Sequence, residues 1–398
     1  MIHFFNPGHE VAVLNDSPFY MPPSNVMQMA SELSLLPFWY AQSGDYIFVT
    51  DDDSKNYCQE LNKKLNANII AFTESDIPQI ESIIKGQKAQ FWGISLQAIH
   101  FWTELNNKYQ LELSIPRFDN AYRDLCSRKF SNNILDHITQ RLQQIDKKLL
   151  PRFFTDLTDI EEYVANTKFR LLAKAPYSSS GRGLLWLPIA KLTRTELQIL
   201  HGILRKQGSV SIERVLEKQI DFAMEFLIDP SEQVFFSGYS VFETNGKGAY
   251  IGNYLDSQAN LERKILSFID SNILENTKST ILALLKEYIA PHYQGCLGVD
   301  MLLYEENGKI KLHPCVEINV RTNMGYLSIH VHEHYMQNRS EGFFRVEFNS
   351  KDKFILGRDL ELKDKYPLEI NNNQIIKGYL PLCPVSEKSK YHAYVIVN

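Results

Sequence analysis

A β-hairpin is predicted by residues 296–321, which read CLGVDMLLYEENGKIKLHPCVEINVR. Two strand-like runs flank Asn307-Gly308, and this pair is the strongest short-range hairpin signal because both turn residues must take a positive φ. With these two residues as the turn, Glu306 faces Lys309, and Asp300 lies across from Cys315. A turn of three residues would shift this register by one residue and would move Asp300 to the opposite face.

Four polar side chains share one face of this predicted hairpin. Side chains alternate between the two faces of a strand, so Asp300 projects from the same side as Glu317, Asn319 and Arg321. The diagonal from Asp300 to Glu317 separates their Cα atoms by roughly 7–8 Å, which lets the two carboxylates share metal ions. Carboxylate and amide oxygens suit Mg²⁺, and Arg321 offers a fork of donors for a phosphoryl oxygen. A solvated sheet face with ordinary charge pairs is the alternative interpretation.

A second segment, residues 169–187, reads FRLLAKAPYSSSGRGLLWL. It predicts a strand that ends at Lys174, a loop of small polar residues, and another strand. Small residues let backbone N–H groups approach phosphates closely, and a lysine supplies a point charge for the same oxygens. The segment is not a Walker A loop, because the G-x-x-x-x-G-K-[ST] pattern is absent and a strand follows the loop. Its composition alone favours a flexible hairpin loop.

The two segments, in this order along the chain, resemble the ATP-grasp superfamily. That family has a strand ending in lysine, a Gly/Ser-rich lid loop, a hinge strand that begins with Glu, and an Asp/Glu…Glu-x-Asn-x-Arg metal site. Residues 210–216 (VSIERVL) resemble the hinge, and residues 221–229 (DFAMEFLID) resemble the strand after it. Upstream, Lys129 stands at the opening of a helix as in the family, although Arg128 replaces the usual Asp. The resemblance covers roughly residues 116–335.

The resemblance implies a site for ATP and Mg²⁺. One or two Mg²⁺ ions, for which Mn²⁺ could substitute, would be held by Asp300, Glu317 and Asn319. Arg321 and Lys174 would be the catalytic residues, with Arg321 on the migrating phosphoryl group. Asp221 would hold the ribose, and Glu225 would be either a third metal ligand or the partner of a lysine. The residues implied to contact the nucleotide are Lys129, Lys174, Ser178, Ser179, Ser180, Gly181, Arg182, Gly183, Glu213, Arg214, Val215, Leu216, Asp221 and Glu225.

The expected fold class is mixed α/β and α+β. Strand-like runs at 2–5, 46–50, 68–72 and 90–94 alternate with helical patterns at 26–36 and 55–65, which is typical of a parallel α/β sheet. The resemblance implies that this Rossmann-like, pre-ATP-grasp domain (1–115) precedes an ATP-grasp fold of two α+β subdomains. The small subdomain (116–210) would carry the lid loop (177–183), and the large subdomain (211–345) the metal site. A C-terminal extension (346–398) would follow.

Composition and charge narrow the classes of partner. The 398 residues are 44% hydrophobic and 22% charged, with a net charge of −5 at pH 7. This composition is typical of a globular protein of two or three domains, and the sequence lacks the clustered positive charge of nucleic-acid-binding surfaces.

The five cysteines are scattered without a C-x-x-C pair, which favours a reducing cytoplasm over disulfides or structural zinc. No signal-peptide pattern opens the chain and no apolar run is long enough for a membrane span. We therefore expect neither nucleic acid nor a membrane as partner.

The reaction implied by the resemblance is an ATP-dependent ligation. A carboxylate is activated as an acyl phosphate and joined to an amine or a similar nucleophile. Two alternatives stay open, namely an ATP-grasp kinase that phosphorylates a small-molecule hydroxyl and a non-catalytic ATP-binding sensor or scaffold. The carboxylate and the amine could each be a small molecule or a peptide, and these residues do not identify either substrate. A homodimer is also compatible with the resemblance.

Two further motifs have competing interpretations. Residues 6–10 (NPGHE) follow the first predicted strand, where α/β sheets place ligands, so they form either part of the acceptor site or a plain tight turn. His330, His332 and His334 invite a zinc hypothesis, but the H-E-x-x-H pattern is absent. We expect these three side chains to be surface or core histidines.

Overall fold

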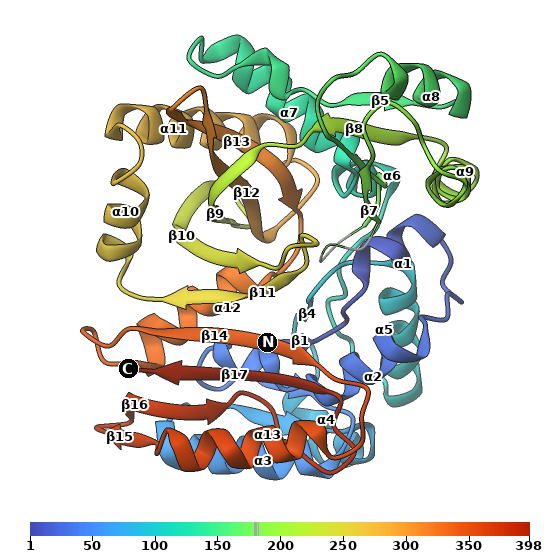
Figure 1. The fold of residues 1–398 in the computed structure, drawn as a ribbon. Helices are drawn as coiled ribbons and strands as arrows, with labels where there is room; N and C mark the ends of the chain where they lie inside the picture. Colours follow the sequence, from blue (N-terminus) through green and yellow to red (C-terminus); the bar gives the residue numbers. More distant parts are fainter. Residues whose placement is uncertain (179–180, 182) are drawn as a thin grey trace.

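The computed structural model describes residues 1–178, 181 and 183–398. Three sheets organise these residues: a parallel sheet near the N-terminus, a small antiparallel sheet, and a long antiparallel sheet that runs through the middle and the C-terminal part of the chain. Figure 1 shows the small sheet (green) at the upper right, above the N-terminal helix α1 (blue), and the long sheet running from yellow-green strands at the left down to the red strands at the bottom. Within the described part of the chain, no helix is long and apolar enough to cross a membrane.

Four parallel strands form the N-terminal sheet, in the order β3-β2-β1-β4. They are β1 (Ile2–Phe4), β2 (Tyr46–Phe48), β3 (Ile70–Phe72) and β4 (Ala89–Phe91). The helices around them are α1 (His9–Asn15), α2 (Ser24–Glu32), η1 (Leu36–Trp39), α3 (Asp52–Leu65), η2 (Glu74–Asp76), α4 (Ile77–Ile84) and α5 (Leu96–Tyr109). The predicted parallel α/β arrangement is confirmed. The helix predicted over 26–36 is instead divided into α2, which ends at Glu32, and the 3₁₀ helix η1, which begins at Leu36. A proline disfavours the α conformation of the residue before it, so an α-helix that continues to Leu36 beside Pro37 is unfavourable.

Side-chain caps define where the two long helices of this domain begin. The Asp51 carboxylate accepts a hydrogen bond from the backbone N–H of Ser54 at 2.8 Å, and the Ser95 hydroxyl accepts one from Ala98 at 3.2 Å. These contacts satisfy backbone donors that the first turn of a helix leaves without a partner. Asp52 and Asp53 follow in the first turn of α3, where negative charge is favourable.

The small sheet has the strand order β5-β8-β6-β7, and all of its pairs are antiparallel. Its strands are β5 (Arg152–Phe154), β6 (Leu171–Lys174), β7 (Leu184–Leu187) and β8 (Val210–Arg214). Two amphipathic helices, α8 (Leu157–Ala165) and α9 (Arg194–Gln207), bury their apolar sides on it in a separate core. The helices α6 (Asn120–Leu125) and α7 (Arg128–Arg141) and the 3₁₀ turn η3 (Lys147–Leu149) precede the sheet.

Nine strands form the long sheet, in the order β13-β12-β9-β10-β11-β14-β17-β16-β15. They are β9 (Glu217–Ile228), β10 (Val234–Thr244), β11 (Tyr250–Leu255), β12 (Gly295–Glu306), β13 (Lys309–Asn319), β14 (Gly342–Phe348), β15 (Glu369–Asn371), β16 (Gln374–Pro381) and β17 (Tyr391–Val397). The helices α7, α10 (Gln258–Leu266) and α11 (Ser271–Tyr288) cover the first strands of this sheet and share a core with them. The helix α12 (Met324–His330) continues into the π-helical turn η4 (Val331–Tyr335), and α13 (Phe354–Lys365) follows β14.

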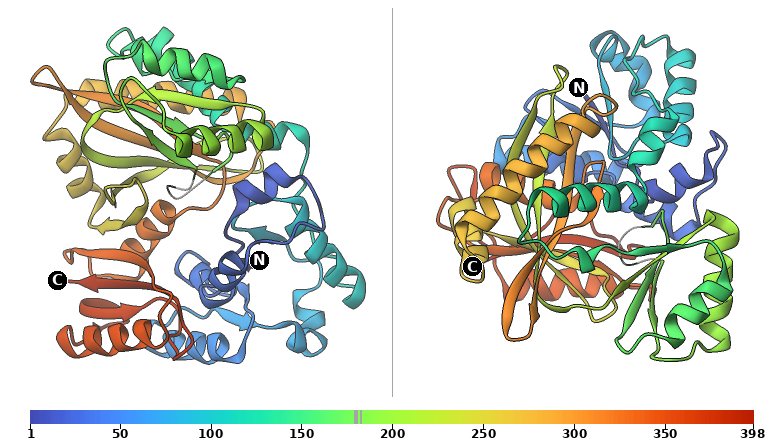
Figure 2. Two further views of the ribbon diagram at one scale, coloured as in Figure 1. Left: turned by 45° about the vertical axis from the view of Figure 1, so that its right-hand side comes forward. Right: turned by 90° about the horizontal axis from the view of Figure 1, so that it is seen from above.

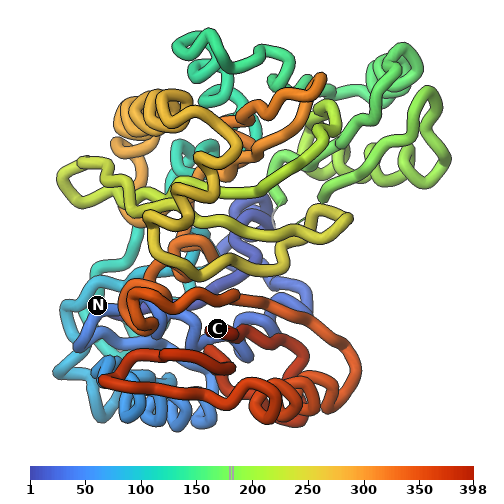
Figure 3. Tube along the Cα trace, turned by 60° about the vertical axis from the view of Figure 1, so that its left-hand side comes forward, coloured from blue at the N-terminus to red at the C-terminus, as the bar shows by residue number. Residues whose placement is uncertain are grey.

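The C-terminal strands pack on the N-terminal domain. One core joins residues of the first hundred positions, such as Phe38 and Leu61, to Phe344 of β14 and Val395 of β17. The indole N–H of Trp39 donates to the backbone oxygen of Leu382 at 3.0 Å across this contact. Figures 2 and 3 show the red C-terminal strands beside the blue N-terminal elements from further directions. Residues 342–397 thus extend the same sheet that carries β9 to β13.

The hairpin of β12 and β13 turns where the sequence predicts. Asn307 and Gly308 have φ of 54° and 72°, and Glu306 pairs with Lys309. The register holds as far as Leu302 opposite His313 and then shifts, so that Asp300 lies opposite Glu317. The predicted pairing of Asp300 with Cys315 is therefore wrong. Pro314 follows His313 and has no N–H for the ladder, and a bulge on β13 takes up the extra residues. The shift is even, so the predicted common face of the two carboxylates survives.

Candidate nucleotide and metal site

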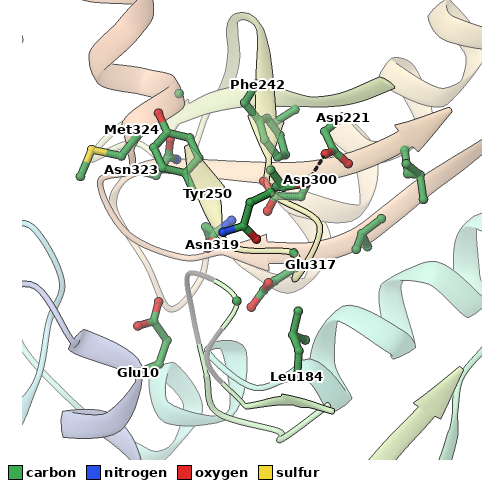
Figure 4. Close-up of a pocket in the computed structure, with 18 of the residues that line it drawn as sticks. Glu10, Leu184, Asp221, Phe242, Tyr250, Asp300, Glu317, Asn319, Asn323 and Met324 are labelled. Carbon is green, nitrogen blue, oxygen red and sulfur yellow. Dashed lines mark hydrogen bonds between the residues drawn. The ribbon is translucent and has the colours of Figure 1, made fainter. Parts of the chain in front are cut away.

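A cavity of about 720 Å³ opens between the sheets. Strands β6, β7 and β8 line one side of the cavity, and strands β9, β10, β12 and β13 line the other. The segment after β1 closes the end of the cavity beside the N-terminal sheet. The predicted site residues that line it are Lys174, Gly181, Glu213, Arg214, Val215, Leu216, Asp221, Glu225, Asp300, Glu317, Asn319 and Arg321. Figure 4 shows Asp300, Asn319 and Glu317 in its middle, Asp221 and Phe242 on one side, and Tyr250 and Met324 on the other.

The acidic pair in the middle of the cavity comes from neighbouring strands. Asp300 of β12 lies directly opposite Glu317 of β13, and Asn319 is opposite Gly298 on the same ladder. Burial and the carboxylate of Glu317 raise the pKa of Asp300 well above its usual value, so the pair favours a cation between its oxygens. Within the described residues no three His, Cys, Asp or Glu side chains are grouped to hold a metal. Two carboxylates and an amide fit Mg²⁺, which usually keeps waters and substrate phosphates in its remaining positions.

Two cations reach the same part of the cavity. The Arg128 Nη2 atom lies 2.9 Å from Glu317 Oε2, and the Lys174 Nζ atom lies 2.5 Å from Glu213 Oε1. Both cations are buried, with side-chain exposures of 9% and 7%. Buried charges need partners, and an incoming polyanion can share these cations with their present carboxylates. The arrangement is suited to a triphosphate.

Arg128 and Lys129 begin helix α7 after the capping residue Ser127, and their side chains diverge. Arg128 lines the cavity, whereas Lys129 is exposed and is not among the lining residues. Successive side chains on a helix point in directions about 100° apart, so only one of the two can face the cavity. The sequence singled out Lys129 because of its match to the family, and it missed Arg128.

The hinge segment lies beside the small sheet. Glu213 and Arg214 end β8, and Val215 and Leu216 follow. These four residues form part of one wall of the cavity. Trp186 of β7 and Met301 of β12 also line the cavity. Backbone groups beside apolar walls are suited to a planar ring that carries hydrogen-bonding nitrogens.

Asp221 of β9 lies farther along the same wall. Its Oδ2 atom is 2.6 Å from Lys218 Nζ and accepts a hydrogen bond from the Thr244 hydroxyl at 2.9 Å. Lys218 and Thr244 line the cavity too, and the sequence interpretation had named neither of them. A carboxylate held in this way is available to hydroxyl groups of a ligand.

Glu225 is buried behind the acidic pair. It accepts hydrogen bonds from the Ser240 hydroxyl at 2.9 Å and from the Asn323 amide at 2.8 Å. Burial raises its pKa to about 7. Both of these hydrogen-bond partners are uncharged. Of the two alternatives predicted for Glu225, a metal ligand or the partner of a lysine, the second differs from these contacts among the described residues.

The predicted lid loop is described at four of its seven positions. Tyr177 accepts and donates backbone hydrogen bonds with the Gln207 amide, and the buried Ser178 hydroxyl donates to the backbone oxygen of Ala175 at 3.3 Å. Gly181 lines the cavity, and a Cβ atom there would lie 2.7 Å from the Cα of Ala249. The loop thus touches the β10–β11 turn of the long sheet at a point where only glycine fits. Ser178 and Gly183 do not line the cavity, and Ser179, Ser180 and Arg182 lie outside the described residues.

Arg321 follows β13 and meets the N-terminal domain. Its Nε–H donates to Glu10 Oε1 at 2.6 Å, Nη2 donates to Asn319 Oδ1 at 2.9 Å, and Nη1 donates to the backbone oxygen of Thr322 at 3.1 Å. Glu10 belongs to the NPGHE turn, for which the sequence had left an acceptor site and a plain turn open. No local signal in the sequence links that turn to a residue 311 positions farther along the chain.

The geometry can be compared with known proteins. No protein-family model and no curated protein sequence matches the chain. Among solved structures, the biotin carboxylase–β-γ-ATP complex from Campylobacter jejuni is similar over 100% of this chain and 87% of its own, with a TM-score of 0.54 and 11% identity. The biotin carboxylase domain of 2-oxoglutarate carboxylase from Hydrogenobacter thermophilus, solved with MgADP, ADP and bicarbonate, is similar over 100% and 86%, with a TM-score of 0.52 and 10% identity. The chain has an ATP-grasp fold.

A third solved structure has a lower score. N5-carboxyaminoimidazole synthetase from Staphylococcus aureus covers 100% of this chain and 93% of its own, with a TM-score of 0.49 and 13% identity. Within the ATP-grasp fold, the cavity lies where the small sheet faces β9 to β13. The predicted fold class is confirmed, whereas the predicted domain boundaries and the roles of single residues stay predictions.

Proposed function

We propose that this protein is a Mg·ATP-dependent ligase that activates a carboxylate as an acyl phosphate and joins it to an amine or a similar nucleophile. One observation carries the proposal: the opposed carboxylates of Asp300 and Glu317 share a cavity with two buried cations, Lys174 and Arg128. This combination suits a magnesium–polyphosphate complex, because the acids need a divalent cation and the cations need a polyanion. The ATP-grasp fold adds support of its own.

The nucleotide would lie along the small sheet. Its adenine would meet the hinge at 213–216, its ribose Asp221, and its phosphates Lys174, Arg128 and the lid. Asp300, Glu317 and Asn319 would hold Mg²⁺, with Glu225 as the further candidate ligand behind them. When bound, Mg²⁺ would neutralise charge on the β- and γ-phosphates during transfer. The lid would exclude water, since an acyl phosphate is lost by hydrolysis.

Arg321 would hold the carboxylate that receives the phosphoryl group. Three of its five N–H groups bond to Glu10, Asn319 and Thr322, and each terminal nitrogen retains one further hydrogen. Two hydrogens on a planar guanidinium can bind a carboxylate or an acyl phosphate. Catalysis then depends on orientation and charge, and little general-base chemistry is needed from the protein.

The substrate that binds in the part of the cavity beside the N-terminal domain would carry an apolar group. Met29 of α2, Trp92 after β4, Met324 of α12 and Val346 of β14 line the part of the cavity beside the N-terminal domain. The described Lys and Arg residues that line the cavity are those of the nucleotide wall and of the Arg321 segment, namely Arg128, Lys174, Arg214, Lys218 and Arg321. Apolar walls favour an acceptor whose side chain is aliphatic or aromatic.

Trapping the acyl phosphate tests the proposed reaction without knowledge of the natural amine. The purified protein is given ATP, Mg²⁺, hydroxylamine and a panel of carboxylic acids that differ in charge and in apolar side chain. The acyl phosphate and hydroxylamine form a hydroxamate and release phosphate, so the right acid yields a hydroxamate, ADP and phosphate in equal amounts. Mass spectrometry identifies the hydroxamate.

Substitutions in the hairpin provide the controls. Glu317→Gln and Asn319→Ala should lower hydroxamate formation about 100-fold or more, because charge stabilisation in such sites is worth factors of this size. Glu305→Gln, an acid of the same hairpin that does not line the cavity, should leave it unchanged. Wild-type turnover in the first two variants would show that the metal site is assigned wrongly. A phosphoester product would identify a kinase, and Mg·ATP binding without turnover across the panel would favour a sensor.

A further inference from the structure

Glu10 and Arg321 form an ion pair between distant parts of the chain. Their side chains are 9% and 13% exposed, and the Arg321 Nε atom lies 2.6 Å from Glu10 Oε1. Burial alone would raise the pKa of Glu10, but the Arg321 guanidinium, the His9 ring and hydrogen bonds together outweigh burial and lower this pKa to about 2. Glu10 is therefore ionised at neutral pH, and the pair is fully charged.

The rest of the NPGHE turn holds Glu10 in place. The Asn6 amide donates to the backbone oxygen of Gly93 at 2.7 Å and accepts from its N–H at 3.1 Å. The His9 ring packs on Gly93, where a Cβ atom would lie 2.4 Å from the ring. Any side chain at position 93 would push His9 away, so the close packing of this turn requires the glycine.

A second contact ties the backbone before Arg321 to the same turn. The Tyr122 hydroxyl donates to the backbone oxygen of Val320 at 2.9 Å and lies 2.9 Å from His9 Nε2. That nitrogen is also 3.1 Å from the backbone oxygen of Ile94. Because Tyr122 gives its one hydrogen to Val320 and a carbonyl only accepts, His9 Nε2 carries a hydrogen. Burial lowers the pKa of His9 to about 4, so His9 is neutral and does not compete with Arg321 for Glu10.

A third contact lies on the other side of Arg321. The backbone N–H of Thr322 donates to the backbone oxygen of Trp92 at 2.9 Å. Thr322 is thus bonded to the N-terminal domain, Val320 is bonded to Tyr122 of α6, which also contacts His9, and the Arg321 side chain is bonded to Glu10. Arg321 faces Asp300 and Glu317 in the cavity, and both attract its charge. Glu10 opposes this attraction from the other side.

We propose that Glu10 is a positioning residue for Arg321, which keeps the guanidinium off the metal-binding carboxylates and directs its remaining N–H groups at the reacting carboxylate. This inference rests on the proposed function through the role given to Arg321. Without Glu10, the guanidinium would turn toward Glu317 and Asp300 and would compete with Mg²⁺ for their oxygens. The NPGHE turn is then a part of the active site that need not touch the acceptor.

Kinetics of three variants test the positioning role. Glu10→Gln keeps the shape and removes the charge, and Glu10→Asp keeps the charge on a shorter side chain. The matched control is Asp16→Asn, which breaks the more exposed ion pair that Asp16, after the same helix α1, forms with Arg123 of α6 at 2.7 Å. We expect kcat of Glu10→Gln to fall about 100-fold, since a misplaced catalytic group costs a factor of this order. Its Kd for Mg·ADP should stay within about a factor of two at saturating Mg²⁺, and a higher Mg²⁺ concentration should be needed for half-maximal rate. Glu10→Asp should recover part of kcat, and Asp16→Asn should match the wild type.

Chemical modification gives a readout that does not depend on turnover. Phenylglyoxal reacts with guanidinium groups, and peptide mass spectrometry measures its addition at Arg321. Modification should be faster in Glu10→Gln than in the wild type or in Asp16→Asn.

Tyr122→Phe provides a second variant if Glu10→Gln does not fold. This substitution keeps every charge but removes the hydrogen bond to Val320, and we expect an intermediate modification rate at Arg321. If no acid supports turnover, the proposed function fails, whereas the modification rates still decide the positioning role. Wild-type reactivity of Arg321 in the folded variants would overturn it.

Discussion

Glu225 combines complete burial with two neutral hydrogen-bond donors. Ser240 and Asn323 satisfy both carboxylate oxygens, yet burial raises the pKa of Glu225 to about 7, from an ordinary value of 4.5. Ionised Glu225 is thus less favourable in the folded chain than in the unfolded chain. The residue lines the cavity next to Asp300, so its protonation affects the electrostatics of the metal site as well as stability.

This shift gives a pH-dependent contribution to stability. Between pH 4.5 and pH 7 the folded protein retains a proton on Glu225 that the unfolded chain has lost. The stabilisation is complete below about pH 4.5 and is lost as the pH rises to about 7, with a total of about 3 kcal/mol. Glu225→Gln cannot lose a proton, so its free energy of unfolding relative to wild type should rise by about that amount from pH 4.5 to pH 8. Urea unfolding of both proteins at these pH values measures the difference, and a pH-independent difference would contradict the assignment.

At the scale of the element, the β12–β13 hairpin depends on its turn and on its bulge. Asn307 and Gly308 provide the positive φ angles that a two-residue turn needs. The bulge near Pro314 then brings Asp300 opposite Glu317 rather than Cys315. The turn fixes which face the acids share, and the bulge decides how closely they approach.

Two glycine substitutions isolate the cost of the turn. A Cβ atom would meet nothing within 4 Å at Gly308 or at Gly202 of α9, so neither substitution changes packing. Gly308 has φ of 72°, which disfavours alanine, whereas Gly202 lies inside a helix, where alanine is favoured. Gly308→Ala should lower the free energy of unfolding by about 1 kcal/mol, and Gly202→Ala should raise it by about 0.5–1 kcal/mol. Urea denaturation measures both, and shifts of the same sign would contradict this account of the turn.

At the scale of the whole molecule, the last strands and the first domain form one core. Phe344 and Val395 are completely buried with Phe38 and Leu61, although up to about 350 positions separate them in the chain. Residues 346–398 are therefore not a dispensable tail. Their strands continue the sheet that bears the acidic pair.

A matched pair of phenylalanines tests this connection. Phe344→Ala removes a ring that is 0% exposed and should destabilise the protein by about 3–5 kcal/mol, as truncation of a core ring usually does. Phe235→Ala removes a ring of β10 that is 51% exposed and should change stability by at most about 0.5 kcal/mol. Chemical denaturation followed by tryptophan fluorescence compares them, because Trp39 and Trp92 report on the shared core. Equal effects of the two substitutions would refute the shared core.

Local patterns in the sequence were sufficient for several features. Strand and helix alternation predicts the parallel N-terminal sheet, Asn307-Gly308 predicts the hairpin turn, and the strand ending at Lys174 is confirmed as β6. These features depend on φ preferences and on the side-chain period, which act over a few residues. The last fifty residues are harder to interpret, because β15 has only three residues and β17 pairs with β14, from which the helix α13 and two further strands separate it in the chain.

The acidic hairpin illustrates the division between sequence and tertiary structure. The sequence by itself determined that Asp300, Glu317 and Asn319 share a face, because strand parity survives a shift of two residues. Only the tertiary structure decided that Arg128 and not Lys129 enters the cavity, and that Glu10 pairs with Arg321. Those choices depend on how a helix is rotated and how distant parts of the chain pack together. Such long-range packing leaves no periodic mark on the chain, and so it cannot be read from local pattern.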